Sequence, residues 1–402
     1  MQPFDTIVIG GGIVGAAAAR ALAIGNSADH RKGQDILLVD ALDAGHTRGS
    51  SHGDGRIVRF TYPEAAYLEM AKSAFNDWAN IERDSGVRLI ETTGGWECGP
   101  SGSPEIADLV SGMGQAGIAF ERLTGKQSLD RFPYFQVEED RDVLYQSDGA
   151  IVRADRAVET LWSLVKSSGA KVAPYHRVEH IEAHDGGSER LLRVSGRRDD
   201  QSPFQFECRN VVLTAGGWSR DLLASLDLAL PLKSTREVVG YFPVRTESEV
   251  DHRVGQMPTL IDYDGDVVFY ALPQIDVPGV KVGWHHAGPE TDANELGELD
   301  AAVLDGIVAY VKRRFPHLVP EPVQVSTCLY TNTPDYHFVV DRHPQIPEIV
   351  IGTGFSGHGF KFGPVLGEIL AQLATGSEPH LDLSLFGLDR LLQGNWTPRT
   401  SA

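Results

Sequence analysis

The sequence predicts an α/β fold in which a parallel sheet is interrupted by an inserted antiparallel sheet. Two observations carry this prediction. Continuous Val/Ile/Leu runs recur near residues 6–9, 36–39, 210–213 and 349–351, as expected of parallel strands that are covered on both faces. Between the last two runs, residues 237–285 contain several short strands whose connections carry Pro, Gly and Asp, as in an antiparallel sheet.

The first element is a strand, a glycine turn and a helix. Thr6-Ile7-Val8-Ile9 is typical of a strand, and Gly10-Gly11-Gly12-Ile13-Val14-Gly15 turns it into an Ala-rich helix that runs to about Ile24. Gly10 permits the tight turn, Gly12 lets the backbone approach a pyrophosphate, and Gly15 lets the helix pack on the strand. The helix N-terminus, with Ile13 and Val14, offers N–H groups and a positive dipole end to the phosphates.

The second strand, at residues 36–39, ends in Asp40. A carboxylate at this place can accept hydrogen bonds from ribose hydroxyls. The order of strand, turn, helix, strand and acid favours a Rossmann-like nucleotide-binding unit over a βαβ unit without a nucleotide. Because the spacing from Gly10 to Asp40 is longer than usual, we interpret Gly25 to Gln34 as a surface insertion.

A segment rich in Gly, Ser, His and Arg follows at residues 46–59, without helical or strand periodicity. Two of its arginines, Arg56 and Arg59, lie three residues apart and could simply decorate a surface helix. However, a loop beside a cofactor needs glycines for close approach and cations for anionic groups. We therefore predict a functional loop here.

Periodicity predicts the secondary structure of the middle of the chain. Apolar residues between Tyr67 and Ile81 keep helical spacing, which indicates an amphipathic helix that packs one face. A strand at 94–99, a short helix from about 105, a helix at about 154–168 and a strand at 178–183 follow. The buried strand at 210–213 ends in small residues, which let the backbone pass close to a bound nucleotide.

The last part completes the two domains. Strands are expected at residues 237–244, 259–262, 267–272 and 280–285, a helix at about 299–311, and a strand at 349–351 that leads through a glycine-rich segment into a helix to about 373. These elements predict a discontinuous nucleotide-binding domain at residues 1–90, 146–225 and 320–385. Residues 91–145 and 226–319 form the predicted substrate domain, and residues 386–402 a C-terminal tail.

Length, charge and cysteine usage narrow the class of protein. The 402 residues suggest two domains, and 36 basic against 55 acidic residues give a formal charge of −19, which favours a small ligand over nucleic acid or an anionic membrane. No run of 18 apolar residues occurs, so we expect neither a transmembrane helix nor a signal peptide. Cys98, Cys208 and Cys328 form no C-x-x-C pair. We therefore expect no disulfide framework and no metal site, in a reducing, cytoplasmic setting.

Four blocks of the sequence resemble the monomeric sarcosine oxidase family, which consists of FAD-dependent amine oxidases within the D-amino-acid-oxidase-like group. The blocks are Ser51-His52-Gly53-Asp54 through Arg59, Cys328 through Asp335, Asp341-Arg342-His343-Pro344, and Gly354 through Lys361. The similarity runs over nearly the whole chain. Since the family includes sarcosine, N-methyltryptophan and pipecolate oxidases, the resemblance implies a Rossmann-like FAD-binding domain with bound FAD.

The resemblance implies roles for four residues. Cys328 matches the cysteine that attaches covalently to the flavin ring, whereas by composition alone it would be an ordinary buried thiol. Arg59 and Lys361 match a pair that clamps the substrate carboxylate, although each taken singly would more often be a surface cation. Lys281 matches the lysine placed where oxygen reacts, and a fixed cation there would stabilise superoxide as it forms. A lysine within an apolar strand is costly unless it is partnered, so Lys281 is already unusual on sequence grounds.

Further pocket residues follow from the same resemblance. His285, Tyr270, His52, Arg56 and Tyr330 match residues that line the flavin and substrate pocket, and Lys281, His285, Arg56 and Tyr270 are the candidates for the catalytic step. Such a histidine or tyrosine could instead serve only packing and hydrogen bonding. The other expected FAD contacts are Ser51, Val178, Ala215, Gly216, Trp218, Gly354, Gly357, His358, Gly359 and Lys361. Gly55 stands where the family is expected to carry threonine, which removes a hydroxyl and leaves room.

The implied reaction is the oxidation of a secondary amino acid, N-methyl or cyclic, by a monomeric enzyme. A hydride passes to the flavin, molecular oxygen is reduced to hydrogen peroxide, and the imine product hydrolyses. The alternatives are a pipecolate or N-methyltryptophan oxidase, an amino-acid dehydrogenase with an acceptor other than oxygen, and a flavin-binding protein without turnover. Tyr62-Pro63-Glu64 and residues 341–344 look nearer to the pipecolate and peroxisomal sarcosine oxidase branch. However, Arg399-Thr400-Ser401-Ala402 is no Ser-Lys-Leu-type peroxisomal address.

Overall fold

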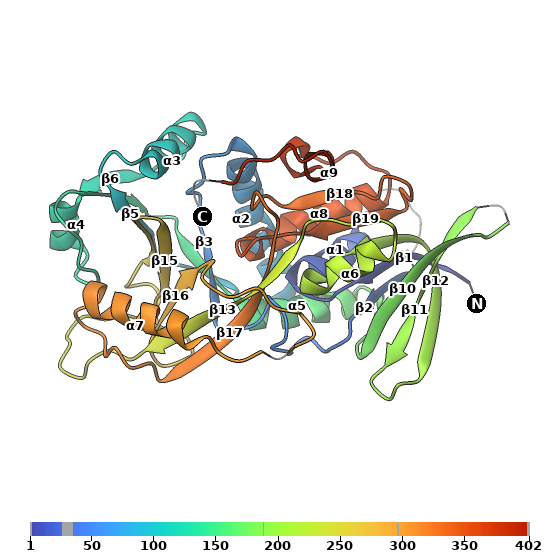
Figure 1. The fold of residues 1–402 in the computed structure, drawn as a ribbon, viewed down its shortest axis with the longest axis horizontal. Coiled ribbons are helices and arrows are strands. Elements are labelled where there is room, and N and C mark those ends of the chain that lie inside the picture. Colours follow the sequence, from blue (N-terminus) through green and yellow to red (C-terminus); the bar gives the residue numbers. More distant parts are fainter. Residues whose placement is uncertain (1, 26–34, 188, 296, 400–402) are drawn as a thin grey trace.

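The structure, a computed structural model, describes residues 2–25, 35–187, 189–295 and 297–399. Within these residues the strands form two eight-stranded sheets and a small three-stranded sheet. The two large sheets occupy opposite halves of an elongated molecule (Figure 1). Apart from Gly25, the expected insertion from Gly25 to Gln34 lies outside the described residues.

The first sheet is the predicted parallel sheet with antiparallel additions at two places. Its strands are β1 (Phe4–Ile9), β2 (Ile36–Val39), β9 (Lys171–Ala173), β10 (His176–Asp185), β11 (Arg190–Arg198), β12 (Pro203–Leu213), β18 (Val339–Arg342) and β19 (Ile349–Thr353). Their order is β10-β11-β12-β1-β2-β9, and β19 pairs with β12 and β18. Strand β12 is longer than the predicted 210–213 strand because its first half pairs antiparallel with β11, and only its second half runs parallel to β1 and β19.

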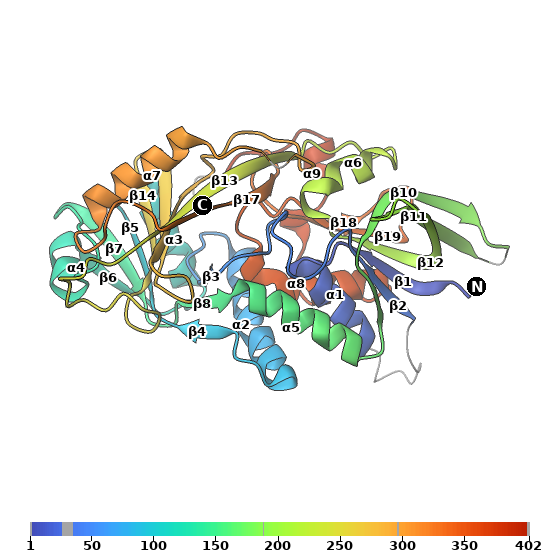
Figure 2. The same cartoon turned by 90° about the horizontal axis from the view of Figure 1, so that it is seen from below.

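Helices cover both faces of this sheet. They are α1 (Ile13–Ile24), α2 (Ala65–Ser85), α5 (Ala154–Ser167) and α8 (Gly363–Ala374) on one face, and α6 (Ser219–Ala224) and α9 (Asp389–Leu392) on the other (Figure 2). Side chains alternate along each strand, so Val8 and Val212 pack under the first group and Ile7 and Val211 under the second. Burial on both faces explains why these strands are continuously apolar.

The second sheet is mostly antiparallel and runs in the order β17-β13-β16-β15-β14-β5-β7-β6. These strands are β17 (Gln324–Asn332), β13 (Lys233–Phe242), β16 (Val280–His285), β15 (Val267–Leu272), β14 (Thr259–Asp264), β5 (Gly95–Pro100), β7 (Arg141–Gln146) and β6 (Glu121–Thr124). The helices that pack against it are α7 (Ala301–Arg314), α3 (Pro104–Gln115) and α4 (Gly125–Arg131). Strand β13 starts four residues before the predicted 237–244 strand, since it pairs with β17 from Lys233 onward.

Strand β17 belongs to the second large sheet. The predicted limits assign residues 320–385 to the nucleotide-binding domain, but β17 pairs along its length with β13 of the second sheet. This pairing is between segments about ninety residues apart, which no local pattern in the sequence indicates. The domain limits themselves stay a prediction.

The third sheet corrects two expectations about residues 46–59. Gly55–Val58 form strand β3, which pairs with β8 (Ala150–Arg153), and β8 pairs with β4 (Ile90–Thr92). The segment is therefore not an irregular loop throughout, and its pairing partner lies a hundred residues away. The room expected at Gly55 is filled, because a Cβ there would lie 2.5 Å from Ile275 Cδ1.

Short 3-10 turns complete the fold, namely η1 (Gly216–Trp218), η2 (Phe360–Phe362) and η3 (Ser384–Phe386). None of the helices in the described ranges combines the length and apolar character that crossing a membrane requires. The same residues contain no group of three or more His, Cys, Asp or Glu side chains that could hold a metal ion.

We expect Asp262→Asn to destabilise the second sheet by about 3–5 kcal/mol, because it breaks a buried ion-pair network by removing one partner. Asp262 is 1% exposed and accepts hydrogen bonds from Arg141, from Tyr310 Oη at 2.9 Å and from Arg314 Nε at 3.0 Å. It thereby joins β14 to β7 and α7. Urea denaturation of the holoprotein measures the change, with the exposed Asp200→Asn as matched control. A difference from the control below about 1 kcal/mol would contradict the role of this network.

Candidate active site

A cavity of about 520 Å³ lies between the two large sheets. One end is walled by β1, β2 and the N-terminus of α1, and the other by β13, β15, β16 and β17. The predicted site residues that line it are Gly10, Gly12, Ile13, Val14, Asp40, Ser51, His52, Arg56, Arg59, Val178, Ala215, Gly216, Trp218, Tyr270, Lys281, His285, Cys328, Tyr330, Gly357, His358, Gly359 and Lys361. The fold thus gathers side chains from distant parts of the sequence around one space.

Gly15 and Gly354 do not line this cavity. A Cβ at Gly15 would lie 1.8 Å from the carbonyl oxygen of Gly10, so this residue allows the close packing of α1 on the turn after β1. Gly354 has a φ of +63°, and it shapes the turn that follows β19.

The first end of the cavity is built by the glycine turn. Gly10 has a φ of +97°, which glycine adopts readily, and Ser51 Oγ accepts the N–H of Ile13 at 3.1 Å. Asp40 accepts the N–H of Gly11 at 2.5 Å through Oδ2 and that of Leu42 at 2.7 Å through Oδ1. Each carboxylate oxygen retains a further lone pair for a ligand hydroxyl.

Trp162 of α5 supports this turn and was not predicted as a site residue. Its indole Nε1 donates to the carbonyl of Gly11 at 2.7 Å, and its ring lies so close that a Cβ at Gly11 would approach it to 2.4 Å. In the sequence Trp162 is one apolar position of an amphipathic helix, so nothing distinguishes it from its neighbours in the core.

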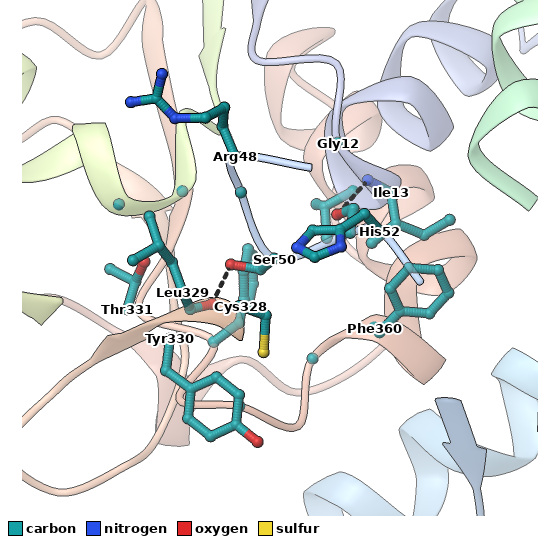
Figure 3. Close-up of a pocket in the computed structure, with 18 of the residues that line it drawn as sticks. Gly12, Ile13, Arg48, Ser50, His52, Cys328, Leu329, Tyr330, Thr331 and Phe360 are labelled. Carbon is teal, nitrogen blue, oxygen red and sulfur yellow. Dashed lines mark hydrogen bonds between the residues drawn. The ribbon is translucent and has the colours of Figure 1, made fainter. Parts of the chain in front are cut away.

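Strand β17 forms the wall at the other end. It presents Cys328, Leu329, Tyr330 and Thr331 along the cavity, with the sulfur of Cys328 directed into it (Figure 3). The hydroxyl of Ser50 donates to the carbonyl of Leu329, which holds the 46–59 segment against this strand (Figure 3). Burial raises the pKa of the Cys328 thiol.

Two cations lie beside Cys328. The ammonium of Lys281, which is 6% exposed, donates to the carbonyl of Gly55 at 3.3 Å, and burial together with the charge of Arg56 lowers its pKa to about 7. Arg56 donates to the carbonyls of Gly55, Ser50 and His52 at 2.9, 3.0 and 2.6 Å. In the described part of the chain neither cation has a carboxylate within 4.0 Å. Their charges are therefore available to an anion in the cavity.

Two neutral histidines offer polar atoms to the same cavity. Burial lowers the pKa of His52 to about 4 and that of His285 well below its usual value, so both rings are uncharged at neutral pH. His285 Nδ1 lies 3.2 Å from the hydroxyl of Tyr330. The Nε2 atoms of both rings are buried and lack a hydrogen-bond partner among the described residues. Such orphaned atoms are costly unless a ligand satisfies them.

Arg59 and Lys361 lie at the same end of the cavity but differ in their partners. Arg59 donates to Thr61 and forms a buried ion pair with Glu97 of β5, at 2.7 Å between Nη1 and Oε1. Lys361 donates to Tyr62 Oη at 2.9 Å and to the carbonyl of His358 at 2.8 Å. Within the described ranges no carboxylate lies within ion-pair distance of Lys361. The two cations are thus an unequal pair, which the sequence did not indicate.

Glu97 is a functionally important residue that the sequence analysis did not identify. It is 2% exposed in the strand Gly95–Pro100, between Trp96 and Cys98. A glutamate among apolar strand neighbours was a usable signal, because such a group is buried only with a partner. Its partner, Arg59, lies 38 residues away.

The sequence model of the FAD dependent oxidoreductase family matches residues 5–373. The chain belongs to this family. As an FAD-dependent oxidoreductase it is similar to the monomeric sarcosine oxidase of Bacillus sp. (strain NS-129), with 31% identity over 392 residues that cover 96% of this chain and 97% of that protein. It is also 33% identical to the peroxisomal sarcosine oxidase of Homo sapiens, over 96% of both chains. N-methyl-L-tryptophan oxidase of Salmonella heidelberg (strain SL476) is 29% identical over 97% of this chain and 100% of that protein.

Solved structures of amino-acid-oxidising enzymes share the fold. NikD, described as an unusual amino acid oxidase essential for nikkomycin biosynthesis, superposes with a TM-score of 0.80 at 21% identity, over 96% of this chain and 98% of NikD. L-proline dehydrogenase from P. horikoshii superposes with a TM-score of 0.77 at 18% identity, over 98% of this chain and all of that one. The predicted fold class is therefore confirmed.

The residues of the cavity fit FAD. The glycine turn, Asp40 and the N-terminus of α1 suit the dinucleotide half, because a Cβ at Gly12 would already lie 3.0 Å from Ser51 Oγ in this cradle. At the other end lie the Nε2 atoms of His52 and His285, which lack a partner among the described residues, and the cations Lys281 and Arg56, which have no carboxylate within 4.0 Å in that part of the chain. These groups suit a polar, electron-accepting ring.

Proposed function

We propose that this FAD-dependent oxidoreductase oxidises the CH–NH bond of a secondary amino acid, N-methylated or cyclic, in the manner of a sarcosine oxidase. The observation that carries the proposal is that Lys361, a cation without a carboxylate partner in the described residues, faces the same cavity as Cys328 and Lys281. An acid group held at Lys361 would place the rest of the amino acid toward Cys328 and Lys281. The names of the two sarcosine oxidases and of N-methyl-L-tryptophan oxidase support this substrate class.

The protein's part in this reaction is to bind and orient. Bound FAD supplies the two-electron oxidation of the substrate and the transfer of those electrons to oxygen. Lys361, helped by Arg59, holds the substrate carboxylate, while Tyr270, Tyr330 and the neutral His285 enclose the amine. The positive charges of Lys281 and Arg56 disfavour a protonated amine, so the substrate binds as the neutral amine and needs no separate catalytic base.

Lys281 serves the second half of the reaction. Its positive charge, which is present below its pKa of about 7, lies in a buried site and stabilises negative charge that develops on oxygen. An amino-acid dehydrogenase is the alternative, with a quinone or protein as electron acceptor. Detection of one hydrogen peroxide per oxidised substrate in air supports the oxidase, and oxidation without peroxide supports the dehydrogenase.

The substrate is identified by an anaerobic spectral titration of the holoprotein. The compounds to compare are sarcosine, N-methyltryptophan, pipecolate, proline and a fructosyl amino acid. Bleaching of the flavin absorbance by one of them supports the proposal and selects among the sarcosine, N-methyltryptophan and pipecolate alternatives. A flavin that none of them bleaches would favour a binding protein without turnover.

We further propose that the enzyme is a cytoplasmic monomer. Cys98, Cys208 and Cys328 are free, which suits a reducing compartment. Four of the similar enzymes carry the word monomeric in their names. Light scattering after size-exclusion chromatography tests the monomer, and a mass near 87 kDa, about twice the 43.7 kDa of one chain, would contradict it.

We expect Cys328→Ser to release the flavin from acid-denatured protein. In our proposal Cys328 holds the ring through a thioether, and serine offers no sulfur for this bond. After precipitation in acid and filtration, the yellow colour should stay with the wild-type protein and pass into the filtrate of the variant. Cys98→Ser, which changes a buried thiol outside the cavity, is the control and should retain the colour. Wild-type protein that loses all of its colour would contradict the tether.

A further inference from the structure

Arg399, in the predicted C-terminal tail, is buried against the wall of the active site. The six residues before it, 393–398, are all exposed, whereas the side chain of Arg399 is only 2% exposed. In Figure 1 the segment after α9 runs back from the first sheet past α2 toward the middle of the molecule. The buried side chain of Arg399, together with its backbone N–H, which donates to the carbonyl of Asp335 at 3.4 Å, thus anchors an otherwise exposed segment.

The contacts of Arg399 are specific. Its guanidinium forms a two-point ion pair with Glu64, at 2.8 Å from Nε to Oε1 and 3.0 Å from Nη2 to Oε2. Nη1 lies 3.2 Å from Nε2 of His358, and the same nitrogen of His358 lies 3.2 Å from the carbonyl oxygen of Tyr336. Because Glu64 immediately precedes α2, and His358 lines the cavity just before Gly359 and η2, Arg399 links the start of α2 to the cavity wall. Two-point pairs of this kind fix orientation as well as charge.

Three cations surround one tyrosine ring at this place. The distances to the ring centroid of Tyr62 are 4.8 Å from Arg59 Cζ, 5.5 Å from Lys361 Nζ and 5.5 Å from Arg399 Cζ. Glu97 balances Arg59 and Glu64 balances Arg399. Lys361 is the remaining cation, so the cluster as a whole has room for one more negative charge. A substrate carboxylate supplies such a charge.

Polar contacts through His358 and Tyr62 connect Arg399 to Lys361. The hydroxyl of Tyr62 accepts from Lys361 Nζ at 2.9 Å and lies 3.4 Å from Nδ1 of His358, whose other nitrogen contacts Arg399. The charged and titratable groups that face Lys361 are Arg59, Tyr62, Glu97, His285, His358 and Arg399. Removal of Arg399 would change both the positions of His358 and Tyr62 and the charge around Lys361.

We propose that Arg399 is a positioning residue of the substrate site, which orients His358 and Tyr62 and sets how strongly Lys361 holds the substrate carboxylate. This inference rests on the proposed function, since it requires an acid substrate at Lys361. The 393–399 segment acts as a strap, and the ion pair with Glu64 fastens it.

The signs of the charges give a prediction that separates this role from mere structural support. Burial and the charges of Arg59 and Arg399 lower the pKa of Lys361 well below its usual value. Loss of Arg399 removes a cation and leaves Glu64 unbalanced, so the pKa of Lys361 rises. Loss of the Glu64 charge leaves Arg399 unbalanced, so the pKa of Lys361 falls. The two changes oppose each other, although each breaks the same ion pair.

The experiment uses holoprotein of three variants, Arg399→Ala, Arg399→Lys and Glu64→Gln. Stopped-flow reduction, with the N-methyl or cyclic amino acid that reduces the wild-type flavin fastest, gives the Kd of the substrate from pH 6 to 10. The pH above which binding weakens should rise by roughly one unit in Arg399→Ala and fall by a similar amount in Glu64→Gln. Arg399→Lys keeps the charge but not the two-point geometry, so it should keep the wild-type pH limit while Kd rises several-fold. It also keeps the test open if Arg399→Ala does not fold.

Shifts in the same direction, or no shift, in Arg399→Ala and Glu64→Gln would overturn the role of Arg399. If Arg399→Ala yields no protein, the other two variants test the same point. The pH limit should stay at the wild-type value in Arg399→Lys and fall in Glu64→Gln. The substrate's own amine titrates equally in every variant and so cancels in the comparison. A wild-type flavin that no amino acid reduces would instead refute the proposed function, and the two failures are thus distinguishable.

Discussion

Replacing Lys281 with methionine should slow reoxidation of the reduced flavin by oxygen about 10²–10³-fold, the usual effect of removing one preorganised charge from a buried reaction site. Methionine fills a similar volume without the charge, and Lys281 has no carboxylate partner within the described residues whose loss would complicate the result. Reduction of the flavin by substrate should change only a few-fold, because in our proposal Lys361, and not Lys281, holds the carboxylate. Stopped-flow mixing of the reduced protein with oxygenated buffer measures the first rate, and anaerobic mixing with substrate the second.

The pH dependence of reoxidation provides a second readout for the same variant. Because the pKa of Lys281 is lowered to about 7, the cation is present below this pH and is lost as the pH rises through it. Wild-type reoxidation should therefore slow with rising pH in this range, and the Lys281→Met protein should lack that dependence. The exposed Lys312→Met on α7 is the matched control and should behave as wild type. Equal slowing of both half-reactions in Lys281→Met would contradict the assigned role.

Replacing Lys361 with methionine should raise the Kd of the substrate about 30- to 1,000-fold, which corresponds to about 2–4 kcal/mol for truncating one partner of a buried charge pair. The effect is expected at Lys361 because Glu97 already balances the charge of Arg59. Stopped-flow reduction of the flavin as a function of substrate concentration gives Kd and the limiting rate separately.

A comparison with the uncharged amide of the same amino acid tests whether this loss comes from the carboxylate. Wild type should bind the acid much better than the amide, while Lys361→Met should bind both about equally. The exposed Lys126→Met of α4 serves as control. If Lys361→Met kept its preference for the acid, Arg59 would be the main carboxylate ligand, with its Glu97 pair broken on binding.

Local patterns were sufficient for much of the first sheet. The runs that become β1, β2 and β19 are continuously apolar because helices cover both faces, and the glycine turn at residues 10–15 needs its glycines for backbone approach. Each requirement falls on consecutive or closely spaced residues, so it leaves a pattern in the sequence. The resemblance to a known family added Cys328, Lys281 and Lys361, which composition alone would not have singled out.

The sequence could not predict the pairing of strands that lie far apart in the chain. Strand β3 exists because β8 pairs with it, and β17 joins the second sheet because β13 lies beside it. Neither segment has a periodicity that requires this partner. The ion pair of Arg59 with Glu97 likewise joins two strands that only the fold brings together.

The sequence by itself determined that a glycine turn of the nucleotide-binding type, three cysteines and several cations exist in this protein. Only the tertiary structure decided which of those cations keep an unbalanced charge, because neutralisation depends on where Glu97 and Glu64 come to lie. The burial that changes the pKa of Lys281 and Lys361 likewise arises only when both sheets close around the cavity. Charge pairing and desolvation act through space over a few ångströms, and sequence separation carries almost no information about that distance.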